Sequence, residues 1–443
     1  MSGTDPFILR RLPDWLAFRR DLHRHPELGF TEYRTISKLA QRLRPLGYTL
    51  RLGPDAISRE AIIGAPPASA IEAAKAQALA SGALVEDVER MPDGTTALIA
   101  ELRRSEGPIV AMRFDVDALA LNEDSSDMHR PRRLGFASAA PGLMHACGHD
   151  GHATIGLAIA EFAAQNDTSW SGTLRLIFQP AEEGGRGARA MVEAGAVDGV
   201  DLFVALHLGC DLPSREIACA AKSMMFSAKW DVVFRGTAAH AAGNPENGRN
   251  ALLAGAQAVT ALYALPRHGC LATHVNVGRF QGGTARNVIA DRAELEIELR
   301  GEAAAALDHM ERRARWTLDG IAAAHGCELV VTEMGRTIGA ETSPRAASLI
   351  RAVAEALPDI ERVHDDWPLG GGDDAAFFMH RVQDQGGLAA YLILGSDLAA
   401  GHHAINFDFE EADIGIGVRL MAGVLAAATN GGFSFSDERR RTA

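Results

Sequence analysis

The densest group of metal-binding side chains lies in the nine residues Met144–His152, which read Met-His-Ala-Cys-Gly-His-Asp-Gly-His. This stretch combines one thiol, three imidazoles and one carboxylate with two glycines. Thiolate, imidazole and carboxylate groups bind Zn²⁺ in proteins, and sites rich in oxygen ligands also suit Mn²⁺ or Co²⁺. We therefore interpret the stretch as half of a metal site, with its remaining ligands elsewhere in the chain.

The remaining candidate ligands follow apolar runs that are typical of buried strands. Glu182 and Glu183 come shortly after a run that ends at Phe178, and His207 directly follows another run. In open α/β sheets, ligands bind beyond the carboxyl ends of the strands, so these side chains are expected to converge. A later loop, Gly401-His402-His403, adds imidazoles. The candidate metal ligands are Cys147, His149, Glu183, His207 and His403.

Five ligands are more than one tetrahedral catalytic metal ion needs. Two ions roughly 3.5–4 Å apart, bridged by a water molecule, use such a set well. An unligated carboxylate must then take the proton of that water, and the Glu182-Glu183 doublet offers one. We expect Glu183 to bind metal and Glu182 to act as general base, passing the proton on to a leaving amine.

Each of these residues, taken alone, also fits a purely structural role. The structural alternatives are a buried small thiol for Cys147, a solvated surface doublet for Glu182-Glu183, a satisfied core histidine for His207 and ordinary loop histidines for His402 and His403. The other two histidines of the central stretch, His145 and His152, are expected to support the site or cap a helix. The combination, and no single residue, favours the metal site.

Composition limits the function classes. The chain has 443 residues, enough for two to three domains, and is 47% hydrophobic and 23% charged. Its net charge of -13 argues against nucleic acid as a partner. An apolar run of 18 residues, the length of a membrane span, is absent from the sequence, so no membrane partner is expected. The five widely spaced cysteines fit free thiols in a reducing, cytoplasmic location.

The order of predicted elements indicates an α/β fold that is interrupted by an insertion. Strands and helices alternate as far as about residue 221, which predicts a mixed-sheet catalytic domain with helices on both faces. From Phe226 to Glu333 the pattern becomes β-α-β-β-α-β, the ferredoxin-like α+β unit. A polar, Gly-rich loop is expected at 365–374. The predicted division is 1–221 and 335–443 for the catalytic domain and 222–334 for the inserted domain.

Three runs carry a resemblance to a known family: Arg20–Glu27, Met144–His152 and Phe178–Gly184. They resemble the aminoacylase/carboxypeptidase family of dinuclear metallopeptidases, and within it the amidohydrolase branch of hippurate, indole-acetyl-amino-acid and p-aminobenzoyl-glutamate hydrolases. The resemblance covers almost the whole chain. It implies cleavage of an N-acyl amino acid amide, with p-aminobenzoyl-glutamate as the expected substrate. Indole-3-acetyl-aspartate or another N-acyl amino acid is the alternative.

The resemblance also assigns roles within the catalytic domain. It implies that the five candidate ligands hold two divalent ions, Zn or Mn, with Glu182 as the general base. His403 is preferred over His402 because it stands four residues before Phe407, as in the family's terminal motif. Asp117 matches an acidic residue that orients a metal-bound group in relatives. The roles of Asp115, Asp373 and His152 stay open, since Asp115 stands where many relatives outside this branch have a metal-binding histidine and Asp373-Asp374 stands where relatives often have Glu-Asp.

The inserted domain is implied to dimerise and to contribute to the active site. His240 matches a histidine that reaches across the dimer to stabilise the developing oxyanion. Asn287 and Arg300 match groups that hold the substrate carboxylate, a task that suits a guanidinium. The neighbouring Arg286 would serve a second carboxylate and so favour glutamate or aspartate. A homodimer is expected, and the alternative is pairing with a related but different chain.

Two other classes of protein fit the sequence less well. The run Gly185–Ala190 follows a strand and begins a helix, like the dinucleotide-binding fingerprint of a nicotinamide oxidoreductase. However, Glu182 and Glu183 would lie where a pyrophosphate approaches, and like charges there are costly. A metal-binding module without catalysis is disfavoured by the free carboxylate of Glu182. A serine hydrolase is disfavoured because the sequence has no G-x-S-x-G run.

Overall fold

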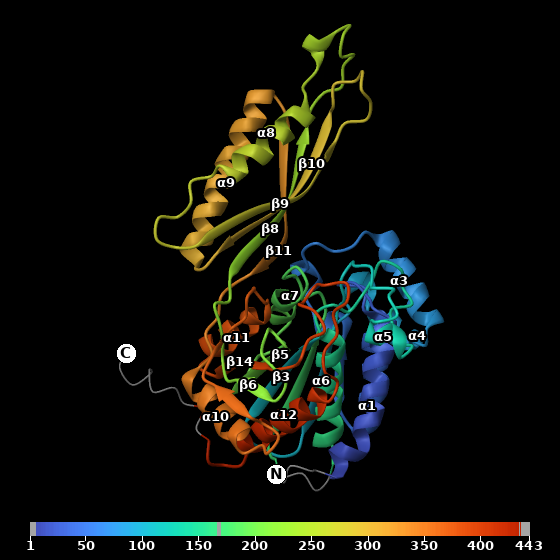
Figure 1. Ribbon diagram of the computed structural model, residues 1–443, viewed down its shortest axis with the longest axis vertical. Coiled ribbons are helices and arrows are strands. Elements are labelled where there is room, and N and C mark those ends of the chain that lie inside the picture. The colour runs from blue at the N-terminus through green and yellow to red at the C-terminus, as the bar shows by residue number, and fades with distance from the viewer. Residues whose placement is uncertain (1–5, 166–169, 434, 436–443) are drawn as a thin grey trace.

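The structure, a computed structural model of the chain, describes residues 6–165, 170–433 and 435. Figure 1 shows a larger body of sheet and helices, with a smaller body standing at one end of it. Strands β8 (Phe226–Arg235) and β11 (Glu328–Thr337) lead from the larger body into the smaller one. None of the described helices is both long and apolar enough to cross a membrane.

The larger body is built on an eight-stranded mixed sheet in the order β1-β2-β4-β3-β5-β14-β6-β12. Its centre is parallel, because β3 pairs in parallel with β4 and β5, and β5 pairs in parallel with β14. β1 and β2 run antiparallel at one edge. The bounds of the strands are β1 Thr49–Leu52, β2 Leu98–Arg103, β3 Ile109–Asp115, β4 Thr173–Gln179, β5 Leu202–Leu208, β6 Glu216–Ala218, β12 Arg362–His364 and β14 Leu388–Leu394.

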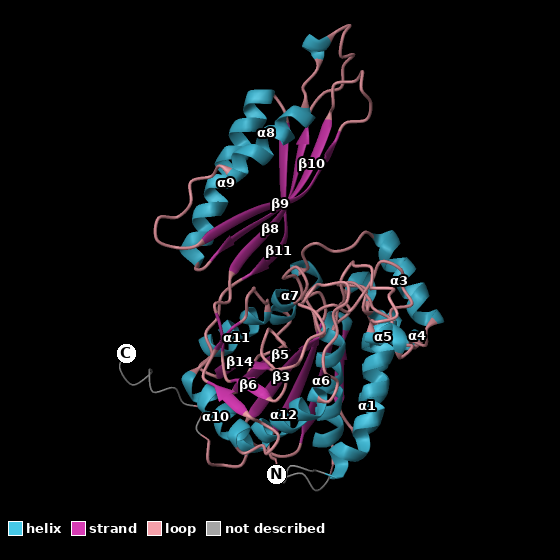
Figure 2. Cartoon of the chain, viewed as in Figure 1, coloured by secondary structure: helices cyan, strands magenta, loops and turns pink. Residues whose placement is uncertain are grey.

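Helices cover both faces of this sheet, as Figure 2 shows. Every residue of β4, β5 and β14 is buried, which is typical of parallel strands with both faces covered. One face is packed by α1, α2, α6, α10 and α12, and the other by α7 and α11. The bounds of the helices are α1 Pro6–Arg24, α2 Tyr33–Leu43, α3 Ala68–Ala80, α4 Val85–Glu89, α5 Arg130–Arg133, α6 His149–Ala163, α7 Ala188–Glu193, α10 Pro344–Glu355, α11 Ala375–Asp384 and α12 Asp413–Thr429.

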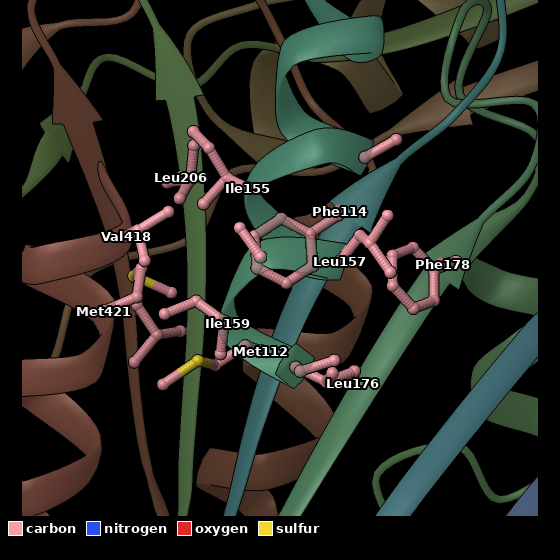
Figure 3. Packing of buried hydrophobic residues seen from close by; sticks show 14 of the residues in the cluster. Met112, Phe114, Ile155, Leu157, Ile159, Leu176, Phe178, Leu206, Val418 and Met421 are labelled. Atoms are coloured by element: carbon pink, nitrogen blue, oxygen red, sulfur yellow. The ribbon is translucent and has the colours of Figure 1, made fainter. Parts of the chain in front are cut away.

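The core between α6 and the sheet fixes the helix that carries part of the candidate site. Phe114 of β3 and Phe178 of β4 lie with their rings 6.0 Å apart, and Leu157 of α6 packs beside them (Figure 3). Gly156 of α6 faces the same two rings so closely that a Cβ atom would lie 2.6 Å from Phe114 and 2.7 Å from Phe178. The close packing therefore holds the N-terminal end of α6 in a fixed place over the strand ends.

The smaller body is a four-stranded antiparallel sheet in the order β11-β8-β10-β9. Helices α8 (Ala251–Tyr263) and α9 (Ala304–His325) pack against it around a separate hydrophobic core. With β9 (Thr273–Gly282) and β10 (Arg292–Gly301), the chain order is the β-α-β-β-α-β order predicted from the sequence. The described residues contain one chain only, so a dimerising role for this body stays a prediction.

The α/β fold with a mixed sheet and helices on both faces is confirmed. The predicted loop at 365–374 is wrong in part, because it contains the short strand β13 (Trp367–Pro368). β13 pairs in parallel with β7 (Ala221–Lys222), which lies far away in the sequence. A two-residue strand of this kind is stabilised by a distant partner and has no periodicity of its own.

Candidate metal centre

The candidate metal ligands come from segments at the carboxyl ends of the parallel strands. β4 ends just before Glu182 and Glu183, and His207 is the last residue but one of β5. Cys147 precedes α6, and His149 is the first residue of that helix. Gly148 between them has φ +90°, a backbone conformation that glycine adopts without steric cost. This turn allows a thiol and an imidazole, two residues apart, to reach the same group of side chains.

The structure brings these side chains within reach of shared metal ions. The Sγ atom of Cys147 lies 3.6 Å from Nε2 of His207. Oε1 of Glu183 lies 3.4 Å from Nε2 of His403 and 4.0 Å from Nε2 of His149. The ligand atoms of Cys147, His149 and His207 all lie within 4.8 Å of one another, and so do those of Cys147, Glu183 and His403. Two overlapping groups of ligands thus share one thiol.

Two buried atoms in this cluster show that the residues fit metal ions. Nε2 of His149 and Oε1 of Glu183 are buried and have no hydrogen-bond partner among the described residues. An unpaired buried polar atom costs free energy, and such atoms in proteins commonly face an ion or an ordered water molecule. Because both atoms belong to groups that bind divalent cations, a metal ion would satisfy them.

Hydrogen bonds to the other ring nitrogens orient the candidate imidazole ligands. Nδ1 of His149 lies 2.9 Å from the backbone carbonyl oxygen of Asp117, and Nδ1 of His207 lies 2.9 Å from that of Leu208. A ring that donates from Nδ1 keeps a lone pair on Nε2 for a metal ion. Burial, followed by the nearby His152 and His402, lowers the pKa of His207 well below its usual range. The neutral form that binds metal is therefore favoured.

His152 and Asp115 form a support beneath the cluster. Nδ1 of His152 lies 2.6 Å from Oδ1 of Asp115, and its Nε2 accepts a hydrogen bond from the backbone N–H of Leu208 at 3.0 Å. Asp115 also accepts a bond from Arg113 at 2.6 Å. Both ring nitrogens of His152 are thus occupied by protein groups, which argues for a supporting role and against metal binding.

A second buried network fixes the segment that follows Glu183. The carboxylate of Asp374 accepts hydrogen bonds from the backbone N–H groups of Gly187 and Ala188 at 3.1 and 2.9 Å. Asp373 accepts a bond from Tyr391 at 2.6 Å, and Arg113 contacts both carboxylates. Asp373 and Asp374 therefore act from below the cluster, by holding the strand ends together.

A cavity of about 360 Å³ opens beside the candidate ligands, between the two bodies. Glu182 lines it and is 13% exposed, so its carboxylate is accessible to a bound molecule. Burial, then the nearby Asp373, Glu183 and Asp374, raise the pKa of Glu182 well above its usual range. A raised pKa suits a carboxylate that must receive and return a proton. The residues of the larger body that line the cavity include Cys147, Glu182, Glu183, His207, His402 and His403, and those of the smaller body include Lys229, Glu298 and Arg300.

The residues assigned to the inserted domain lie at opposite ends of the smaller body. Arg300 lines the cavity, whereas His240, Arg286 and Asn287 are exposed on loops. These loops meet each other, since the N–H of Ala241 donates to the carbonyl oxygen of Asn287 at 3.1 Å, and they form the far tip of the molecule in Figure 1. At about 3.3 Å per residue, the length of β10 alone places some 25 Å between this tip and Arg300. Within one chain, Asn287 and Arg300 are therefore not brought together.

Several residues at the cavity were not singled out from the sequence. His402 lies with Nδ1 3.7 Å from Cys147 Sγ and accepts a hydrogen bond at Nε2 from the backbone N–H of Cys210 at 3.1 Å. Lys229 and Glu298 come from neighbouring strands of the smaller body. Their partly buried charges on otherwise regular strands were a weak signal, because a charge on one face of an antiparallel sheet is normally solvated.

The fold and the cluster define the class of protein as a metal-dependent amidohydrolase built on a mixed α/β sheet. Residues 111–427 match the family described as peptidase family M20/M25/M40, and the chain belongs to this family. The resemblance inferred from the sequence is thus confirmed.

The chain is similar over nearly its full length to named hydrolases. It is 44% identical to indole-3-acetyl-aspartic acid hydrolase of Enterobacter agglomerans, with 95% of this chain and 97% of that protein covered. It is 40% identical to one of the named subunits of p-aminobenzoyl-glutamate hydrolase from Escherichia coli strain K12, with the same coverage of both chains.

Solved structures support the same assignment. A crystal structure of an aminobenzoyl-glutamate utilization protein from Klebsiella pneumoniae matches with a TM-score of 0.82 and 36% identity, covering 95% of this chain and 98% of that one. A Bacillus subtilis protein described as a dinuclear metal binding peptidase of the M20 family matches with a TM-score of 0.65 and 26% identity, covering 96% and 99%. The family and this neighbour support two divalent metal ions at the cluster.

Proposed function

We propose that this protein hydrolyses the amide bond between an acyl group and an acidic amino acid, with p-aminobenzoyl-glutamate as the substrate. Indole-3-acetyl-aspartate is the second candidate, because the similar proteins carry names for both activities. The observation that carries the proposal is the pair of unsatisfied buried atoms, His149 Nε2 and Glu183 Oε1, beside a cavity that also exposes Glu182.

The proposed ligands of two divalent ions, Zn or Mn, are Cys147, His149, Glu183, His207 and His403. When bound, such ions supply Lewis acidity, which polarises a substrate carbonyl and lowers the pKa of water. The protein's own contribution is to place the ligand atoms in advance. The hydrogen bonds at Nδ1 of His149 and His207 do this for the two imidazoles.

Glu182 is proposed to move the proton. Its carboxylate lies 3.9 Å from His149 Nε2 and lines the cavity, so it faces the place where water attacks the amide carbonyl. It accepts a proton from the attacking water and returns it to the amide nitrogen, which then leaves as an amine. Asp117 positions this group, since its Oδ1 accepts a hydrogen bond from the backbone N–H of Glu182 at 3.1 Å.

The smaller body is proposed to bind the substrate and to complete the site across a dimer. Arg300, at the cavity, is suited to the α-carboxylate of the amino acid. His240, at the far tip, is proposed to reach the cavity of a partner chain and to donate a hydrogen bond to the developing oxyanion, with Asn287 beside it. A homodimer is the simplest such assembly. Because the Escherichia coli relative is named for one of several subunits, pairing with a related but different chain is the alternative.

A reducing, cytoplasmic location is also proposed. All five cysteines are free in the structure, which supports a location where thiols stay reduced.

The decisive experiment combines metal analysis with a substrate pair. Purified protein is expected to contain two divalent ions per chain and to release p-aminobenzoate from p-aminobenzoyl-glutamate faster than indole-3-acetate from indole-3-acetyl-aspartate. Chelation should abolish both reactions, and adding back Zn²⁺ or Mn²⁺ separately identifies the active metal. Faster release of indole-3-acetate would favour the second candidate, and metal without hydrolysis of either amide would refute the proposed function.

A further inference from the structure

The wall of the cavity opposite the candidate metal ligands carries a group of three charges from two adjacent strands. Lys229 lies on β8, and Glu298 and Arg300 lie on β10. Lys229 and Glu298 are direct partners in the antiparallel register, so their side chains leave the sheet on the same face. All three residues line the cavity that also contains Glu182. Any substrate that reaches Glu182 therefore lies against this group of charges.

The contacts within the group are unequal. Arg300 holds Glu298 with two hydrogen bonds, at 2.8 Å from Nε and 3.2 Å from Nη2. Nζ of Lys229 lies 3.6 Å from the same carboxylate and 3.4 Å from Oγ of Ser227, both of which are long contacts. Among the described residues, the carboxylate of Glu298 is thus bound by Arg300, while the ammonium group of Lys229 retains N–H donors for another acceptor.

The charges of the three residues sum to one net positive charge, because two cations face one carboxylate. A partly buried ammonium group attracts anions more strongly than a fully solvated one, and the side chain of Lys229 is 30% exposed. If Arg300 takes the α-carboxylate, Lys229 is the remaining cation of the smaller body among the residues that line this cavity. Arg286, the residue that the sequence suggested for a second carboxylate, lies on the far tip of the same chain.

We propose that Lys229 determines substrate specificity by binding the side-chain carboxylate of the amino acid that is released. This inference rests on the proposed function and deepens it. It makes the enzyme selective for glutamate or aspartate conjugates over glutamine or asparagine conjugates, which have nearly the same shape and lack the second charge. Lysine suits this task because its flexible chain lets one ammonium group follow side chains of different length.

The test compares matched amides on the metal-loaded protein. The substrates are p-aminobenzoyl-glutamate and p-aminobenzoyl-glutamine, with indole-3-acetyl-aspartate and indole-3-acetyl-asparagine as a parallel pair. In Lys229→Gln, kcat/KM for the acidic amides is expected to fall about 10- to 100-fold, the usual size of one charge-assisted hydrogen bond, while the neutral amides change less than about twofold. Lys229→Arg should restore most of the preference.

Two further variants serve as controls. Lys222→Gln removes a lysine whose ammonium group pairs with Asp366 at 2.6 Å, away from the cavity, and should leave both substrates unchanged. Arg286→Gln tests whether the partner chain supplies the second cation. Thermal unfolding and metal content confirm that each variant is folded and loaded.

The outcomes separate the two proposals. If wild-type protein hydrolyses neither kind of amide, the proposed function is wrong and the role of Lys229 is wrong with it. If the wild type hydrolyses the acidic amides but Lys229→Gln keeps the acidic-to-neutral ratio, or loses both substrates equally, the role of Lys229 alone is overturned. The same holds if Arg286→Gln, and not Lys229→Gln, removes the preference.

Discussion

Asp117 connects His149 to the two glutamates of the candidate site. Nδ1 of His149 lies 2.9 Å from the backbone carbonyl oxygen of Asp117 and 3.2 Å from its Oδ1. The two carboxylate oxygens of Asp117 accept hydrogen bonds from the backbone N–H groups of Glu182 and Glu183 at 3.1 and 3.0 Å. One carboxylate therefore fixes the tautomer of an imidazole and the position of both glutamates.

The first prediction concerns this carboxylate. Asp117→Asn removes a negative charge and places an amide N–H₂ group against a backbone donor. Metal affinity is expected to fall about 10- to 100-fold, the usual effect of losing such a supporting carboxylate. Titration with a competing chelator measures the affinity. Asp127→Asn is the control because that side chain is fully exposed, and an equal loss in both variants would contradict the assignment.

The second prediction separates catalysis from metal binding. Glu182→Gln keeps the shape of the side chain but removes its basicity, so kcat should fall about 10²- to 10⁴-fold. Two metal ions per chain should stay bound, as measured by elemental analysis. Retained activity would show that another group moves the proton, and loss of metal would show that Glu182 is itself a ligand.

The third prediction concerns the pair of histidines on the terminal loop. Nε2 of His403 lies 3.4 Å from Glu183 Oε1, whereas Nδ1 of His402 lies 3.7 Å from Cys147 Sγ and its Nε2 already accepts a hydrogen bond. His403→Ala is expected to lower the metal content to about one ion per chain, and His402→Ala to leave two. The reverse pattern would exchange the roles of the two residues.

The fourth prediction tests whether His240 acts across a dimer. His240→Ala should lower kcat with both metal ions retained, because the residue lies at the far tip and away from the ligands. Chains of inactive His240→Ala and inactive Glu182→Gln, when mixed and allowed to exchange, should regain activity in hybrid dimers that have one intact site. Absence of recovery, with exchange verified by native mass spectrometry, would place the action of His240 within one chain.

The fifth prediction concerns stability and pH at the start of α12. Burial raises the pKa of Asp413 to about 6, against the hydrogen bonds from Ser214 and Ser396. Because the folded protein favours the protonated form, the contribution of this group to stability is present below its ordinary pKa of 3.8 and is lost as pH rises through about 6. The loss is about 3 kcal/mol for a shift of this size.

Asp413→Asn removes this titration. The free energy of unfolding of the variant, relative to wild type, should therefore rise by about 3 kcal/mol between pH 4 and pH 7, as measured by urea denaturation across that range. Asp14→Asn provides the control because its side chain is 61% exposed. A constant difference between Asp413→Asn and wild type at all pH values would refute the assignment.

The sequence predicted those parts of the fold that repeat over several residues. Fully apolar runs predicted β4, β5 and β14, since a strand covered on both faces has no alternation to hide it. The β-α-β-β-α-β order of the insertion was equally visible. Short elements such as β13 were missed because their hydrogen bonds come from a partner more than a hundred residues away.

The candidate ligands could be proposed from the sequence by themselves. Their residue types decide which ions they can bind, and their positions after strand-like runs indicate that they meet at one edge of a sheet. The tertiary structure decided how each ring is oriented. Both nitrogens of His152 are occupied by Asp115 and Leu208, so this histidine supports the cluster although it stands in the same stretch as His149.

Only the tertiary structure decided which distant residues share the cavity. Asn287 and Arg300 are close in sequence, yet β10 separates them because an extended strand cannot fold back on itself. Lys229 and Glu298 are far apart in sequence, yet antiparallel pairing makes them neighbours. The sequence thus determined which chemistry the chain can perform, because that depends on residue type and local order. The pairing of strands determined where the substrate's charges can bind, because register is fixed by contacts between segments that the linear order does not reveal.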